Sequence, residues 1–128
     1  MHELTVVEGL MGILTSHAKA NAIARITSVH VVIGRLRGLD RRQIAGCFEI
    51  LAEGTLAEGA RLDIEEIGIE GRCRDCGQTF AVPGFQIQCP TCSSVAVDLL
   101  SGQELHIKTF EGKTLEDLGV EESAASTT

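Results

Sequence analysis

Apolar residues recur at helical spacing over the first twenty positions. Segment 4–21, LTVVEGLMGILTSHAKAN, carries them on one face, at Leu4, Val7, Leu10, Met11, Leu14 and Ala18. Spacings of three and four residues predict an amphipathic helix with one side against a core. His17, Lys19 and Asn21 suit the end of that helix, where cations and Asn are favoured.

The next apolar run has a different character. Residues 26–36, ITSVHVVIGRL, are rich in β-branched side chains and predict a strand. GLD then predicts a turn, and Asp40 is placed to cap a second helix over about 41–57. The apolar stripe of this helix consists of Ile44, Cys47, Phe48 and Leu51.

The second half of the chain predicts shorter strands. In 61–70 the apolar positions alternate and then slip by one place, which indicates a bulge or bend. Strands are expected over 95–100 and 104–110, and a helical turn over 114–120. This order predicts an α+β fold, with a small antiparallel sheet, two main helices and an inserted cysteine module.

Charge and composition narrow the classes of function. The 128 residues carry a formal net charge of -7, and the one basic cluster, residues 35–42, contains an acid. With no Trp or Tyr, the chain offers little aromatic surface for stacking bases, so nucleic acid is not expected as a partner. No apolar run approaches the roughly 20 residues of a membrane span, and no secretory signal is apparent, so we expect a cytoplasmic protein without a membrane partner.

Four of the five cysteines form two CxxC pairs twelve residues apart. Cys73 and Cys76 form the first pair, and Cys89 and Cys92 form the second. Two such turns facing each other place four thiolates at the corners of a tetrahedron around Zn²⁺. Four thiolates leave no open position, so this zinc is expected to be structural. Phe80 and Phe85, between the pairs, are expected to form a miniature core.

Other uses of the cysteines stay open at this point. A redox disulfide, an iron centre or an iron–sulfur cluster also employs paired cysteines. Zinc is the commoner occupant of a tetrathiolate site in a cytosolic protein, and we take zinc as the leading interpretation.

Several short motifs together resemble a known family. They are MHE at 1–3, VVIGRL at 31–36, FEILAEGT at 48–55, GARLDI at 59–64, CRDC and CPTC, and SGQEL at 101–105. In this order they are similar to the HypA/HybF family of hydrogenase nickel-incorporation accessory proteins. The chain departs from the family at Ser93, where the family often has Gly.

The resemblance implies a nickel metallochaperone, not an enzyme, that delivers Ni(II) during maturation of [NiFe]-hydrogenase. Its implied partners are a nickel-binding GTPase accessory protein, the hydrogenase large subunit and, in some organisms, urease accessory proteins. The implied organisation is a nickel-binding α+β domain of residues 1–70 and about 101–120, and a zinc module of about 71–100. We expect residues 121–128, which are small and polar, to form a disordered tail.

The same resemblance places the nickel ligand at His2, with Glu3 as the adjacent acid. Imidazole nitrogen suits Ni²⁺, and the Met1 amine and backbone amides beside His2 can close small chelate rings around the ion. Asp40 follows the first strand and is a further candidate oxygen donor, with a helix cap as its simpler role. Protons compete for the imidazole, so nickel affinity is expected to fall as the pH drops through about 6.

An alternative function remains at this stage. The chain could be a zinc-ribbon module that binds a protein or nucleic acid and has no nickel function. That alternative predicts no nickel binding and, for nucleic acid, an affinity that depends on salt.

Overall fold

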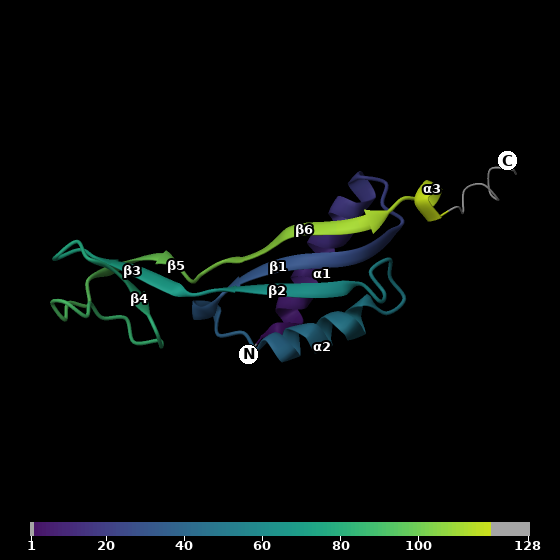
Figure 1. Cartoon of the computed structure of the whole chain (residues 1–128). Helices are drawn as coiled ribbons and strands as arrows, with labels where there is room; N and C mark the ends of the chain where they lie inside the picture. Colours follow the sequence, from purple (N-terminus) through teal and green to yellow (C-terminus); the bar gives the residue numbers. More distant parts are fainter. Residues whose placement is uncertain (1, 119–128) are drawn as a thin grey trace, which may run out of the picture. The chain divides into compact units, whose positions relative to one another are not determined.

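Two compact units make up the chain. The computed structural model describes residues 2–118, so Met1 and the predicted tail lie outside the described residues. The first unit consists of Met1–Val31, Leu39–Ile64 and Ile107–Thr128, and the second of Val32–Gly38 and Glu65–His106. Figure 1 shows their helices and strands. The predicted α+β class is confirmed, while the predicted domain limits stay a prediction.

Helix α1 (Glu3–Ala20) opens the first unit. Val7, Leu14 and Ala18 are buried, as the apolar spacing predicts, but Leu4 is 52% exposed. The prediction that Leu4 lies on the buried face of the helix was therefore wrong. Asn21 ends the helix by donating both its backbone N–H and its side-chain amide to the carbonyl of His17, at 3.1 and 2.8 Å. Among the described residues, no helix is long and apolar enough to cross a membrane.

Helix α2 (Arg41–Ala52) begins where predicted and ends early. Asp40 caps it, because its Oδ1 accepts the backbone N–H groups of Arg42 and Gln43 at 2.8 and 3.3 Å. The predicted end near residue 57 was wrong. The hydroxyl of Thr55 donates to the Ala52 carbonyl at 2.7 Å, and Gly54 adopts a positive φ of 76°. Both features turn the chain away from the helix axis.

A sheet with the order β2-β1-β6 accompanies these helices. Its strands are β1 (Arg25–Gly34), followed by a 3₁₀ turn at Arg35–Arg37, then β2 (Arg61–Ile67) and β6 (Leu105–Lys113). Side chains from α1, α2 and all three strands surround a cavity of only about 10 Å³. That volume is about the limit for one water molecule, so the core of the first unit is closely packed.

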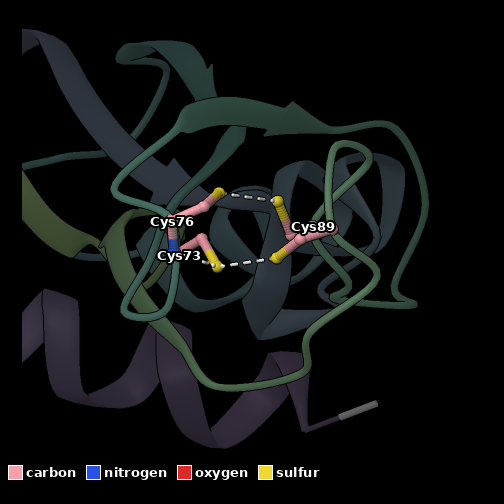
Figure 2. Close-up of side chains that lie close together, drawn as sticks. Cys73, Cys76 and Cys89 are labelled. Atoms are coloured by element: carbon pink, nitrogen blue, oxygen red, sulfur yellow. Dashed lines mark hydrogen bonds between the residues drawn. The ribbon is translucent and has the colours of Figure 1, made fainter.

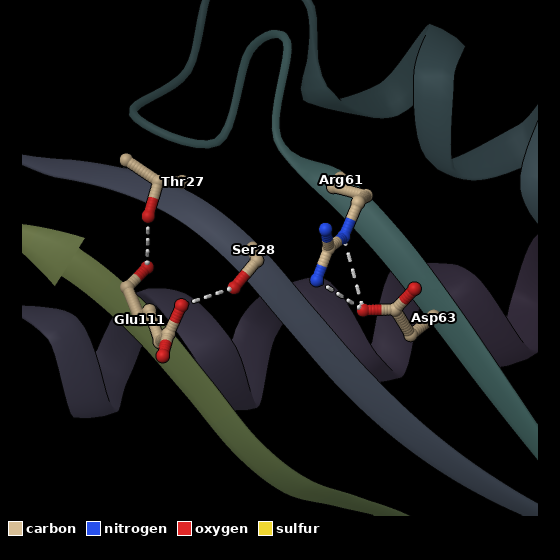
Figure 3. A network of polar contacts seen from close by, with 5 residues as sticks. All are labelled: Thr27, Ser28, Arg61, Asp63 and Glu111. Carbon is tan, nitrogen blue, oxygen red and sulfur yellow. Dashed lines mark hydrogen bonds and ion pairs between the residues drawn. The ribbon is translucent and has the colours of Figure 1, made fainter.

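Polar side chains join β1 to β6 and also pair within β2. The hydroxyls of Thr27 and Ser28 on β1 donate to Glu111 on β6, the first to its carbonyl oxygen at 3.2 Å and the second to its carboxylate at 3.1 Å (Figure 3). On β2, Arg61 pairs with Asp63 at 3.0 Å. Residues more than eighty positions apart therefore meet on neighbouring strands.

The second unit contains an antiparallel sheet with the order β4-β3-β5. Its strands are β3 (Ile69–Cys73), β4 (Thr79–Val82) and β5 (Val97–Ser101). The bend predicted within 61–70 is confirmed, since Gly68 separates β2 from β3 and the β3–β5 register shifts between Glu70 and Gly71. The predicted turn near 114–120 appears as α3 (Leu115–Leu118), and residues 119 and 120 lie outside the described residues.

Two glycines from distant segments meet in the second unit. A Cβ built on Gly34 would lie 2.2 Å from the backbone carbon and oxygen of Gly102. Two backbone hydrogen bonds hold these segments close together. Gly34 N–H donates to the Glu104 carbonyl at 2.7 Å, and Leu36 N–H donates to the Gly102 carbonyl at 2.9 Å. Only a residue without a side chain fits at position 34.

Candidate metal centres

The four paired cysteines converge in the second unit. Their Sγ atoms all lie within 4.8 Å of one another. Two contacts run from one CxxC turn to the other, Cys73 to Cys92 at 3.5 Å and Cys76 to Cys89 at 3.6 Å. Figure 2 shows the side chains of Cys73, Cys76 and Cys89 pointing into this cluster. Zinc–sulfur bonds of about 2.3 Å imply a tetrahedral edge of about 3.8 Å, so the donor set fits a tetrathiolate zinc ion.

Matching backbone hydrogen bonds shape the two turns. In each turn a backbone N–H donates to the sulfur of the first cysteine at 3.4 Å, from Cys76 to Cys73 and from Thr91 to Cys89. In each turn the residue after the second cysteine also donates its N–H to the carbonyl of the first, at 2.9 Å. These donors stabilise negative charge on the sulfurs that would hold a cation.

Exposure differs within each turn. Cys73 and Cys89 are buried, whereas Cys76 and Cys92 are exposed. Burial raises the pKa of the Cys89 thiol, but the backbone N–H groups of Cys92 and Thr91 outweigh it and lower that pKa to about 6. At Cys92 the backbone N–H of Ser94 lowers the pKa, but the neighbouring sulfurs outweigh it and raise that pKa to about 12. The thiols therefore share their protons as a group, and a divalent cation would displace those protons.

A side-chain hydrogen bond joins the two turns outside the cysteines. The Ser94 hydroxyl donates to the Asp75 carboxylate at 2.5 Å and accepts the backbone N–H of Ala96 at 3.0 Å. Asp75 lies inside the first CxxC turn and Ser94 follows the second. The sequence analysis missed this pair, because a lone Asp and a lone Ser nineteen residues apart give no spacing signal.

The expected miniature core between the cysteine pairs forms only in part. Phe80 is half-buried, but Phe85 is 63% exposed. The guanidinium of Arg35 lies 6.0 Å from the Phe85 ring centre and donates to the carbonyls of Val82 and Gly84. A cation over the exposed ring thus replaces the predicted apolar packing at Phe85.

The amino-terminal residues form a separate arrangement in the first unit. Glu3 is buried, with 3% of its surface exposed, and its Oε2 accepts the backbone N–H of Asp40 at 2.8 Å. The Asp40 N–H donor helps to lower the pKa of Glu3 to about 2, against the effect of burial, which raises it. Glu3 is therefore a carboxylate at neutral pH, held beside the start of α2.

His2 lies directly before Glu3 and is exposed. Its carbonyl accepts the N–H of Val6 at 3.0 Å, which starts α1, and its side chain makes no capping hydrogen bond to the helix. His17, at the other end of α1, is about 22 Å further along the helix axis at 1.5 Å per residue. The structure thus brings Glu3 and Asp40 together next to His2, while Met1 lies outside the described residues.

Comparisons with known proteins agree with this architecture. Residues 1–112 match the family model described as "Hydrogenase/urease nickel incorporation, metallochaperone, hypA". Similar curated proteins include the hydrogenase maturation factors HypA of Geotalea uraniireducens and Chlorobium limicola. They are 40% and 38% identical to this chain, over 87% and 86% of it and 98% and 95% of their own lengths.

A solved structure is also similar. The solution structure of the Ni metallochaperone HypA from Helicobacter pylori matches with a TM-score of 0.66 and 31% identity, over 89% of this chain and 99% of that one. Proteins of this family handle metal and are not enzymes. The fold, the motifs and the length of the match together show that this chain belongs to the HypA family of hydrogenase and urease nickel-incorporation metallochaperones.

Proposed function

We propose that this chain carries Ni(II) at its amino terminus and delivers it during maturation of [NiFe]-hydrogenase. His2 supplies an imidazole nitrogen, the Met1 amine closes a chelate ring, and Glu3 and Asp40 are the candidate oxygen donors. Nitrogen and oxygen donors suit Ni²⁺ and exchange ligands more readily than a closed thiolate cage. A cargo ion needs that property, because it must leave the carrier.

One observation carries this proposal. The hydrogen bond from Asp40 N–H to Glu3 Oε2, at 2.8 Å, fixes the residue after His2 against the start of α2. The exposed His2 is therefore followed in the chain by Glu3, a buried residue whose carboxylate is held in place. Pre-positioned donors lower the ordering cost of binding an ion.

The cysteine cluster is proposed as a separate zinc site. Zn(II) would be held by Cys73, Cys76, Cys89 and Cys92. The ion would cross-link the two turns and would keep no open coordination position. Such a site contributes to folding on the order of 10 kcal/mol. Its role is then structural, and the nickel site takes the transferred ion.

The proposed partners follow from the family. They are a nickel-binding GTPase accessory protein, the hydrogenase large subunit, and urease accessory proteins where urease is also served. We place the protein in the cytoplasm, since a reducing compartment keeps the cluster as metal-binding thiolates and not as disulfides.

Nickel titration of the untagged protein tests the amino-terminal site. Wild type is expected to bind one Ni²⁺, while His2→Ala and a form extended by two residues before Met1 are expected to lose that binding. His17→Ala is the matched control, because it removes a histidine from the same helix at its far end, and it should bind like wild type. Equal nickel binding by all four proteins would exclude the proposed site.

A further inference from the structure

An open groove of about 590 Å³ lies between α1 and α2 in the first unit. Helix α1 supplies most of its lining from positions that recur every three or four residues, and Leu51 and Thr55 supply the rest. The α1 members are Glu8, Met11, Gly12, Thr15, Ser16 and Lys19. All of them except the half-buried Met11 are exposed, so this face of α1 is separate from the face that packs into the core.

The six α1 positions are arranged symmetrically along the helix. Counted from the midpoint of positions 13 and 14, the pairs 12 and 15, 11 and 16, and 8 and 19 lie at equal distances on either side. A second α1 in antiparallel orientation would therefore place each position opposite its counterpart. Glu8 would face Lys19 at both ends of the contact, and the small residues Gly12 and Thr15 would meet in the middle.

We propose that this groove binds a second copy of the chain, in a dimer whose two α1 helices pack antiparallel across a two-fold axis near positions 13 and 14. Each groove then receives the α1 helix of the other copy. A two-fold interface uses the same patch on both subunits, so the patch must be complementary to itself. The symmetric spacing of an acid and a base along α1 meets that requirement.

The charges of Glu8 and Lys19 select the antiparallel orientation. The two residues lie about 16.5 Å apart along the helix at 1.5 Å per residue. Among residues 2–118, neither side chain has a hydrogen bond or an ion pair, so both are available to a second copy. Antiparallel helices would form two Glu8–Lys19 pairs. Parallel helices in the same register would place like charges opposite each other, which is unfavourable.

Gly12 supports a close approach of the two helices. A Cβ built at this position would meet nothing within 4 Å, so the packing of a single copy does not require glycine there. Glycine in the middle of a helix is also less favourable than alanine. Opposite Thr15 of the second copy, the missing side chain lets the two helix axes reach the short end of the usual range of about 8–10 Å.

The contact is small, so the dimer is weak. The groove offers eight residues from each copy, whereas a stable interface uses roughly 20 or more. Each copy also carries a formal net charge of -7, which repels the other. The dimer therefore forms at high protein concentration and requires no nickel. Its two His2 residues would lie about 35 Å apart along the helix axes, so each copy keeps its own amino terminus accessible.

Sedimentation velocity of the full chain without nickel tests the dimer, at concentrations from about 10 μM to about 1 mM. Wild type is expected to change from monomer to dimer over this range. Glu8→Lys and Lys19→Glu should each weaken association about tenfold, because each variant places like charges opposite each other. The double variant Glu8→Lys/Lys19→Glu restores both pairs and should dimerise like wild type. A wild-type chain that stays monomeric at about 1 mM, or a double variant that does not recover, would overturn the proposal.

Two further variants control for charge and for shape. Glu49→Lys changes the net charge as much as Glu8→Lys does, but Glu49 is exposed on α2 outside the groove, so this variant should associate at least as well as wild type. A loss equal to that of Glu8→Lys would refute the charge pairing. Gly12→Leu should block the approach of the helices while the helical circular dichroism of the monomer persists. Undiminished dimerisation of Gly12→Leu would contradict the interface.

NMR locates the interface. On dilution from about 1 mM, the amide signals of the groove residues are expected to shift, while those of β3, β4 and β5 should stay in place. In a mixture of labelled and unlabelled chains, NOEs are expected between the Met11 methyl group of one copy and Ser16 of the other. Intermolecular NOEs confined to strand edges would overturn the helical interface and indicate strand pairing instead.

Discussion

Gly77 and Ser93 occupy the same position in the two cysteine turns. Each donates its backbone N–H to the carbonyl of the cysteine four residues earlier, at 2.9 Å, and each has a positive φ, 77° for Gly77 and 65° for Ser93. Glycine adopts this conformation readily, whereas a residue with a side chain is strained in it.

Replacing Ser93 by Gly is expected to stabilise the second unit. Removing the left-handed strain should gain about 1 kcal/mol, after the added freedom of glycine in the unfolded chain is subtracted. Denaturant unfolding of the zinc-loaded protein measures the change. The reciprocal variant Gly77→Ser should lose a similar amount, and equal stability of all three proteins would show that the turns tolerate either residue.

Replacing Gly34 by Ala is expected to damage the second unit. The new Cβ would overlap the Gly102 backbone at 2.2 Å, and backbone has no rotamer through which to move aside. Overpacking of this kind costs about 1–3 kcal/mol, which a thermal melt would detect. Gly9→Ala is the control, since nothing lies within 4 Å of that position and alanine favours a helix by about 1 kcal/mol. A stable Gly34→Ala protein would contradict the close approach.

Substitutions of Asp40 separate its two roles. Asp40→Asn keeps an oxygen that accepts the N–H groups of Arg42 and Gln43, whereas Asp40→Ala loses the cap and about 1 kcal/mol of stability. If the carboxylate binds nickel, both variants should weaken nickel binding, and only Asp40→Ala should unfold more easily. Unchanged nickel affinity in Asp40→Asn would leave the cap as its only role.

The pH response of Glu3 is expected at unusually low pH. Its folded-state pKa of about 2 lies below the usual value near 4.3, so the ionised form stabilises the fold. That contribution is complete above about pH 4.3 and is lost as the pH falls toward 2. NMR titration of the Glu3 carboxyl carbon should give a midpoint near 2, and a midpoint near 4.3 would show that the carboxylate is not held.

Removing zinc should act on one unit more than the other. A chelator is expected to broaden or shift the amide signals of β3, β4 and β5, because the four sulfurs lose the ion that joins their turns. The helical signal of α1 and α2 should persist, since their buried side chains lie in the first unit. Equal loss of both signals would show that the units unfold together.

The elements with strong local signals could be predicted from the sequence. The apolar repeat identified α1 within one residue at each end, and Asp40 marked the start of α2. The CxxC spacing anticipated the convergence of four sulfurs. In each case nearby residues determine the structure, so a pattern in the chain is sufficient evidence.

The failures lie where distant residues decide the structure. The Phe85 ring lies near the guanidinium of the distant Arg35, and Gly34 is required because Gly102 approaches it. The Asp75–Ser94 hydrogen bond likewise depends on the facing of two turns. Asp40 was expected as a candidate donor beside His2 and Glu3, but its hydrogen bond to Glu3 joins residues 37 positions apart and could not be read from the spacing.

The distribution of contacts along the chain also sets an order of assembly during synthesis. All four clustered cysteines lie within twenty consecutive residues, so the cysteine module can close as soon as Cys92 has left the ribosome. The first sheet must wait for β6, whose Glu111 bonds to Thr27 and Ser28. Contacts close in sequence form sooner than distant ones. The growing chain would therefore complete its cysteine turns while its amino-terminal helix still lacks the last strand of the sheet beside it.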